Sequence, residues 1–261
     1  MVKEELNTTD EAAAGGAKTE TGFSDFAKEN LPLLEEMMKA SLFKGKKTSK
    51  THPKMKPYLF GPRNGVEVID LEETLKFFNQ ALDFLKEKLA KKGAVLFVGT
   101  TPAVKDAVRA SAEKLSVPYV TERWLGGTLT NFKTLSKRIA FFKKLKNDKE
   151  TGRLDKYTKK ERVDFDRQIQ KMTTMFSGTE QMEVLPEALV VFDVGANLTA
   201  IREAKRLKIP VVGILNTDTD PSLVNYPVPA NDKSRLSAEW FLGRIEKAAE
   251  EGKNLPKENS N

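Results

Sequence analysis

The feature of this sequence that most constrains its fold is an alternation of short apolar runs with longer amphipathic stretches. Ala94 to Val98 is a continuous apolar run, which is typical of a strand buried on both faces of a sheet. Thr101 and Pro102 then suit the start of a helix that runs to Leu115. The same pattern continues with strand-like runs at Val117 to Val120, Leu189 to Asp193, Val211 to Leu215 and Val224 to Val228. Strands that alternate with helices predict an α/β fold with a parallel sheet.

Helical periodicity marks further segments around this alternation. Leu71 to Leu89 repeats large apolar residues at spacings of three and four, after a capping box that begins at Asp70, and Gly93 is expected to end the helix. Ala196 to Leu207 is predicted as a helix between two of the strands. Residues 131–178 interrupt the alternation with two helical patterns joined by a short turn, which predicts an antiparallel α-helical hairpin.

The length of 261 residues suits one large domain with terminal appendages. Residues 1–30 hold seven acidic residues and three lysines with few large apolar groups, so we predict a disordered acidic tail. Residues 31–250 form the predicted domain, and residues 251–261 a polar C-terminal tail. The absence of cysteine excludes disulfides and thiolate zinc sites. The sequence contains neither a signal peptide nor a run that could cross a bilayer, so we expect a cytoplasmic protein.

Positive charge is concentrated in two stretches, although the whole chain has a net charge of only +7. Residues 39–63 contain eight basic residues and no acid, interleaved with Gly, Ser, Thr and Pro, which favours an extended basic loop over a helix. Residues 123–149 contain eight basic residues and one acid, Asp148. We consider two interpretations of each stretch. It is either a phosphate-binding surface, which is favourable because basic groups that neutralise phosphates release counterions, or a helix or loop face that is only solvated.

Turn signals lie directly after the first basic stretch and within the second. Asn64-Gly65 between two short β-like runs predicts a hairpin. Gly126-Gly127 allows a backbone path with positive φ or a close approach, and Asn131 is a candidate cap for the helix that follows. Trp124 and Tyr58 are candidates to stack on unpaired bases, the alternative being that they complete a core or a protein contact.

The strand-end loops are where a catalytic site would be expected, because ligands of parallel α/β sheets bind there. The segment from Gly99 to Pro102 contains neither a Walker lysine motif nor a GxGxxG motif. Asp193, Asp218 and Asp220 are candidates for a magnesium site, but such residues more often form turns and caps. His52 is the only histidine and has no identifiable partner, so we expect no catalytic residue, no metal and no cofactor. The alternative hypothesis is a nucleotide- or sugar-phosphate-dependent enzyme that uses these loops.

Several segments together resemble a known family. HPKMKPYLFGPRNGVEVIDL (52–71), VLFVGT (95–100), PYVTERWLGGTLTNFKT (118–134), LPEALVVFD (185–193) and IPVVGILNTDTDPSLVNYPVPAND (209–232) occur in the order seen in bacterial small-ribosomal-subunit protein two. The resemblance covers about residues 35 to 245. It implies a flavodoxin-like five-stranded parallel sheet flanked by helices, with a protruding helical hairpin. It also implies a structural component of the small ribosomal subunit with no catalysis.

The partners implied by the resemblance are small-subunit rRNA and neighbouring small-subunit ribosomal proteins, without a membrane or a small-molecule substrate. A non-ribosomal DNA-binding protein is the third hypothesis. The chain departs from the family where a histidine- and glycine-rich segment is replaced by SLFKGKKTSKTHPKM, and where Asp193 is followed by Val194 rather than proline. The residues expected to bind rRNA are Lys44, Lys46, Lys47, Lys50, Lys54, Lys56, Arg63, Arg123, Trp124, Lys133, Lys137 and Arg138.

Overall fold

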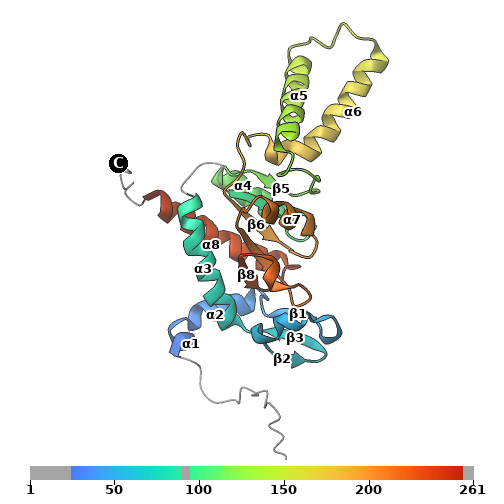
Figure 1. Cartoon of the computed structure of the whole chain (residues 1–261). Helices are drawn as coiled ribbons and strands as arrows, with labels where there is room; N and C mark the ends of the chain where they lie inside the picture. Colours follow the sequence, from blue (N-terminus) through green and yellow to red (C-terminus); the bar gives the residue numbers. More distant parts are fainter. Residues whose placement is uncertain (1–24, 90–94, 255–261) are drawn as a thin grey trace, which may run out of the picture.

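The computed structural model describes residues 25–89 and 95–254, which include a five-stranded parallel sheet (Figure 1). The strands lie in the order β5-β4-β6-β7-β8, and each is parallel to its neighbours. Numbered by their place in the chain, this is the order 2-1-3-4-5 of flavodoxin-like folds. The predicted fold class is therefore confirmed. The strand bounds are β4 (Val95–Val98), β5 (Tyr119–Val120), β6 (Ala188–Phe192), β7 (Val211–Leu215) and β8 (Tyr226–Pro229).

Burial explains why the central strands could be recognised in the sequence. Every residue of β4, β6 and β7 is buried, because these strands have neighbours on both sides and helices on both faces. β8 lies at the edge, where Pro227 pairs with Gly213 of β7. A proline has no backbone N–H to donate to a neighbouring strand, which agrees with a position at the edge of the sheet.

Two hydrophobic layers cover the sheet. On one face lie α3 (Leu71–Leu89), α4 (Lys105–Leu115) and α8 (Arg235–Asn254). Phe78 of α3 packs there against Phe241 of α8, with ring centroids 4.8 Å apart in an edge-to-face arrangement. On the other face lie α7 (Leu198–Arg206), the loop that contains Trp124 and Leu129, and the first turns of the hairpin. The parallel sheet is thus covered on both faces.

The hairpin projects away from this body (Figure 1). It consists of α5 (Phe132–Glu150) and α6 (Lys159–Phe176), within the predicted range 131–178, and η3 (Ser177–Thr179) returns the chain to β5. The buried residues of α5 are Leu135, Ile139, Phe142 and Leu145, at helical spacing. A capping box of Thr158 and Glu161 starts α6.

A small antiparallel sheet lies at the opposite end of the body (Figure 1). Its order is β1-β3-β2, and Asn64 and Gly65, with φ of 53° and 75°, form the predicted turn between β2 and β3. The expectation of an extended loop before this hairpin was wrong, because that segment forms a strand and two 3₁₀ helices. We call residues 44–69 the basic lobe. Its elements are β1 (Lys44–Lys47), η1 (Thr48–Lys50), η2 (Pro53–Tyr58), β2 (Leu59–Arg63) and β3 (Val66–Ile69).

Both ends of the described chain differ from the predicted tails. Of the predicted tail 1–30, residues 1–24 lie outside the described residues, but α1 (Asp25–Glu29) is helical and precedes α2 (Leu31–Lys39). Phe26 is half-buried against the core, and Lys76 lies 5.5 Å from its ring centroid. At the other end, α8 continues to Asn254 instead of ending before residue 251. Gly93, the predicted helix stop, and residues 255–261 lie outside the described residues.

Candidate nucleic-acid interface

The carboxyl ends of the strands meet the basic lobe at a cleft of about 470 Å³. Ligands of parallel α/β proteins bind at this edge. The cleft is lined by Asp193, Asp218 and Asp220, which are the residues considered for a magnesium site, and by Lys46 and Lys233. The sequence therefore placed the acidic residues at one edge, but it did not reveal the lysines beside them.

Each of these aspartates faces a lysine. Asp218 lies 3.2 Å from Nζ of Lys46, and Asp220 lies 2.8 Å from Nζ of Lys54. The Lys54 ammonium lowers the pKa of Asp220 below its usual range, assisted by hydrogen bonds from Ser222. Asp193 pairs with Lys233. Within the described ranges, no group of three or more His, Cys, Asp or Glu residues is arranged to hold a metal ion. The aspartates therefore form ion pairs that connect separate structural elements.

Backbone hydrogen bonds add to this attachment of the basic lobe. The N–H of His52 donates to the carbonyl of Thr217 over 2.8 Å, and the N–H of Lys46 donates to Oγ1 of Thr217 over 3.0 Å. The imidazole of His52 accepts from the N–H of Lys54 and so caps η2. Gly45 lies very close both to Glu67 of β3 and to Thr217, which follows β7. A Cβ on Gly45 would lie 2.7 Å from the carbonyl oxygen of Glu67 and 2.7 Å from a methyl carbon of Thr217. The lobe is thus held against the strand ends.

One buried acid beneath the cleft has a strongly perturbed pKa. Asp232 is 2% exposed and accepts a hydrogen bond of 3.1 Å from the side chain of Asn216. Burial, together with the negative charge of Asp193, raises the pKa of Asp232 to about 6 from its ordinary value of 3.8. No role in a reaction is needed to explain this shift, since desolvation of the carboxylate is sufficient.

The loop that follows β5 is organised around one carboxylate, that of Glu203 on α7. Its Oε1 accepts hydrogen bonds from Nε1 of Trp124 (3.0 Å) and from the N–H of Gly127 (2.8 Å). Its Oε2 accepts from the N–H groups of Leu129 (3.0 Å) and Thr130 (3.2 Å), and from the Thr130 hydroxyl (3.2 Å). Desolvation alone would raise the pKa of Glu203, but these hydrogen bonds outweigh it and hold the pKa below its usual range.

The role considered for Trp124 must therefore be corrected. Its side chain is 8% exposed, packs in the core layer beneath the hairpin and donates to Glu203. A ring in this position is not accessible for stacking on a base. The special backbone path predicted for the glycine pair is present at Gly127, which has φ of +88°. Asn131 stands at the N-cap of α5, although its side chain makes no capping bond within the described part of the chain.

The remaining predicted residues lie on two outer surfaces. Lys46 is half-buried and Lys54 is exposed, but both are paired with aspartates. The others are exposed, and none forms an ion pair with a carboxylate of the described residues. On the basic lobe these are Lys44, Lys47, Lys50, Lys56 and Arg63, and around the start of α5 they are Arg123, Lys133, Lys137 and Arg138. We call residues 123–138 the hairpin root.

A further set of cations next to the hairpin root was missed. Arg202, Lys205, Arg206 and Lys208 are exposed on and just after α7, while Glu203 of the same helix points to the loop. Because Glu203 binds residues 124–130 directly, these cations lie beside the hairpin root. The run REAKRLK at residues 202–208, with four cations and one acid, was the available signal.

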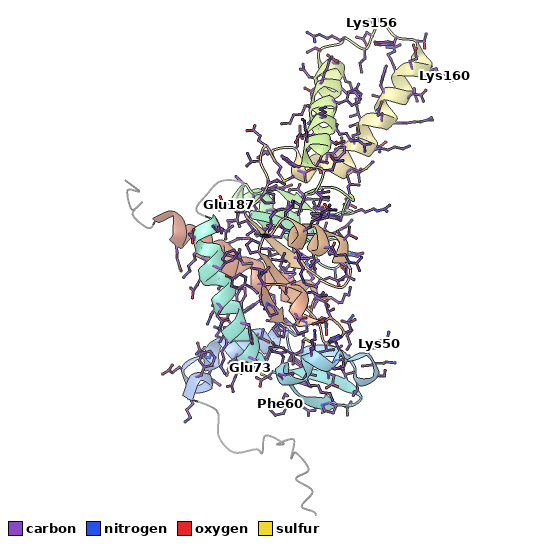
Figure 2. All side chains as sticks on the ribbon, in the orientation of Figure 1. Lys50, Phe60, Glu73, Lys156, Lys160 and Glu187 are labelled. Carbon is purple, nitrogen blue, oxygen red and sulfur yellow. The ribbon has the colours of Figure 1, made fainter. Side chains whose placement is uncertain are left out.

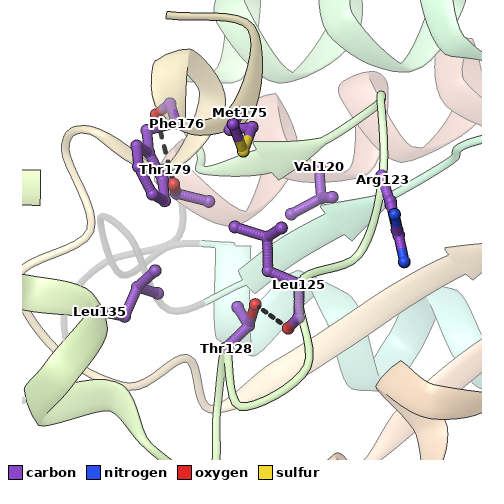
Figure 3. Close-up of a pocket in the computed structure, with 8 residues that line it drawn as sticks. All are labelled: Val120, Arg123, Leu125, Thr128, Leu135, Met175, Phe176 and Thr179. Carbon is purple, nitrogen blue, oxygen red and sulfur yellow. Dashed lines mark hydrogen bonds between the residues drawn. The ribbon is translucent and has the colours of Figure 1, made fainter. Parts of the chain in front are cut away.

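Two cavities lie at the hairpin root. The smaller one has a volume of about 10 Å³, about what one ordered water needs, and the other, of about 160 Å³, lies between residues 125–138 and Phe176. Figure 3 shows Val120, Leu125 and Phe176 around the smaller cavity, which Arg123 also lines. The charged side chains of the hairpin root are nevertheless exposed, so it presents its charge on an outer surface.

An α/β body whose strand-end acids are paired with lysines, and which carries exposed cations on separate outer surfaces, has the features of an RNA-binding scaffold protein. Comparison with protein-family models supports a more specific assignment: the model for Ribosomal protein S2 matches residues 37–252. The chain belongs to the Ribosomal protein S2 family, a family of small-subunit ribosomal proteins. The matched range extends from α2 into α8, so it includes the basic lobe, the sheet and the hairpin.

Proposed function

We propose that this chain is a structural constituent of the small ribosomal subunit that binds small-subunit rRNA through the basic lobe and the hairpin root. Neighbouring ribosomal proteins complete its environment in the cytoplasmic ribosome. The proposed phosphate contacts come from the exposed cations of the two surfaces, extended by those of α7. Lys46 and Lys54 instead hold the basic lobe to the parallel sheet. Trp124 holds the loop between β5 and α5 in place.

The observation that carries this proposal is the contrast between paired and unpaired cations. All three cations of α4 have carboxylate partners: Lys105 and Arg109 pair with Glu122, and Lys114 pairs with Glu246. Nine of the ten exposed cations of the basic lobe and the hairpin root have no such partner within the described ranges, Lys54 being the exception. Their charge is available to phosphates, and phosphate contacts position a protein on RNA without reading its sequence.

The salt dependence of binding tests this proposal. A variant with Lys47, Lys50 and Lys56 changed to glutamine should bind small-subunit rRNA more weakly than the unchanged protein. The slope of log affinity against log salt should flatten by about 0.7 to 0.9 for each phosphate that is no longer neutralised. The matched control changes the three paired cations of α4, Lys105, Arg109 and Lys114, to glutamine. A slope that the lobe variant leaves unchanged would reject the basic lobe as a binding surface.

A further inference from the structure

The basic lobe carries an aromatic side chain that its fold does not use. Phe60 on β2 is 68% exposed, the largest exposed fraction among the large apolar side chains of the described residues. The neighbouring Tyr58 packs instead onto α3, with its ring centroid 5.2 Å from that of Phe77. The exposed Phe60 ring therefore contributes little to the stability of the lobe. Figure 2 shows Phe60 at the outer end of the lobe that also carries Lys50.

A β-bulge places Phe60 in this position. In the pairing of β2 with β3, Leu59 lies opposite Ile69 and Gly61 lies opposite Val68, so Phe60 is the extra residue. Bulges of this kind bend the strand and redirect a side chain. Gly61 has φ of +146°, a conformation that residues with a Cβ rarely adopt. The local backbone is thus specialised to present one aromatic ring.

Cations lie on the same small sheet as this ring. Lys47 of β1 and Arg63 of β2 both pair with Val66 of β3, so they flank the central strand. Arg63 follows Phe60 by three residues, a separation of roughly 10 Å along an extended strand. An aromatic face among phosphate-binding cations is the arrangement by which proteins hold unpaired nucleotides, since the bases stack while the cations hold the backbone.

We infer that Phe60 is a stacking platform for an unpaired base of rRNA. This inference rests on the proposed rRNA binding and adds a chemical identity to what the basic lobe recognises: a nucleotide outside a duplex, held by its π-face. Duplex RNA offers no free base face to such a ring. The occupant is RNA because an exposed aromatic among unpaired cations matches a polyanion that carries aromatic rings.

Four variants of Phe60 in the full chain test the inference with purified small-subunit rRNA. Phe60→Ala should weaken binding by about 5- to 150-fold, the range that one stacked base contributes. Phe60→Trp and Phe60→Tyr should retain the affinity, whereas Phe60→Leu should not restore it. The slope of log affinity against log salt should be the same in all four, because every phosphate-binding cation is kept. Val184→Ala is the control, since Val184 is also an exposed apolar residue but lies outside the lobe.

Three outcomes would overturn the inference. Unchanged affinity of Phe60→Ala would show that the ring contacts no base. Restoration by Phe60→Leu would indicate an apolar contact without stacking. Normal binding of Phe60→Ala to rRNA, with failure to enter small-subunit particles, would indicate that a protein covers Phe60. Failure of the basic lobe as an rRNA-binding surface is distinguishable, because it would appear as an unchanged salt slope in the triple-lysine variant of the lobe, whatever Phe60→Ala does.

Discussion

At the scale of single residues, the most consequential group is the carboxylate of Glu203. Five hydrogen-bond donors converge on its two oxygens, and three of them are backbone N–H groups that have no helix or strand to satisfy them. A buried donor left without an acceptor costs roughly 1–3 kcal/mol, and bonds to charged groups are the stronger ones. Glu203 therefore determines whether the loop before α5 has one conformation or many.

Glu203→Gln should destabilise the protein by roughly 2–4 kcal/mol. One glutamine atom can still accept, but the amide nitrogen then faces donors on the other side of the carboxylate. Denaturant unfolding measures the loss of free energy, and a red shift of tryptophan emission before unfolding would report exposure of Trp124. Glu73→Gln is the control: Glu73 pairs with Lys76 on the surface of α3, so its loss should cost under about 1 kcal/mol. Equal effects of the two variants would contradict this account.

Asp232 predicts a pH dependence of stability. Its pKa is raised to about 6 in the folded protein, whereas the ordinary value is 3.8. The folded state therefore binds this proton more tightly than the unfolded state, and the stabilisation is fully present below pH 3.8. It is lost as the pH rises through 6, by an amount on the order of 2–3 kcal/mol.

Asp232→Asn should lack this component. The difference in unfolding free energy between this variant and the unchanged protein should grow in favour of the variant from pH 4 to pH 7. Asparagine keeps an oxygen that can accept from Asn216. Denaturant titrations of both proteins over this pH range measure the difference, and a constant offset would show that Asp232 does not titrate in this window.

At the scale of elements, the sequence predicted those helices and strands whose formation depends on a local pattern of apolar residues. The strands β4, β6 and β7 are continuous apolar runs, and the helices have their own periodicity, so the parallel sheet and the hairpin could be inferred. β1 could not, because KGKK has no strand pattern and becomes a strand only by pairing with β3 and packing Gly45 against Thr217.

The candidate nucleic-acid interface likewise has features that the local sequence predicts and features that only tertiary contacts create. The exposed lysines of the basic lobe were predicted from charge alone. The pairing of Lys54 with Asp220, 166 residues away, and the burial of Trp124 against Glu203, 79 residues away, depend on tertiary contacts. The bulge that exposes Phe60 depends on strand register, which a single sequence specifies only weakly.

The joint between the hairpin and the sheet provides a prediction at this scale. A Cβ on Gly178 of η3 would lie 2.2 Å from the carbonyl oxygen of Tyr119 in β5, a backbone atom that cannot move aside without disturbing the strand. Gly178→Ala should therefore cost about 2–3 kcal/mol and loosen the hairpin. Thermal unfolding and limited proteolysis of the hairpin measure the two effects.

The control for this change is Gly243→Ala in α8. Nothing lies within 4 Å of a Cβ on Gly243, and alanine is favoured over glycine inside a helix by about 0.5–1 kcal/mol. The two glycine-to-alanine changes should thus shift stability in opposite directions. Similar shifts would mean that η3 can move away from β5 at little cost.

At the scale of the whole molecule, the basic lobe and α5 lie at opposite ends of the body (Figure 1). Among residues 25–89 and 95–254, no helix is both long and apolar enough to span a bilayer. The lobe is fixed to the strand ends by two lysine–aspartate pairs and by backbone bonds, and the hairpin root is fixed by Glu203. Both surfaces are therefore attached to the same sheet.

The attachment of both surfaces to one body predicts how their contributions to binding combine. If both contact one folded RNA, neutralising Lys47, Lys50 and Lys56 and neutralising Lys133, Lys137 and Arg138 should weaken binding independently. Because the surfaces lie far apart and have no residue in common, the two reductions in binding free energy should add within about 0.5 kcal/mol in the combined variant. Titrations of rRNA with all four proteins at one salt concentration measure this. A hairpin-root variant that binds like the unchanged protein would leave the lobe as the only binding surface, whereas a combined reduction well short of the sum would mean that the surfaces bind alternative sites.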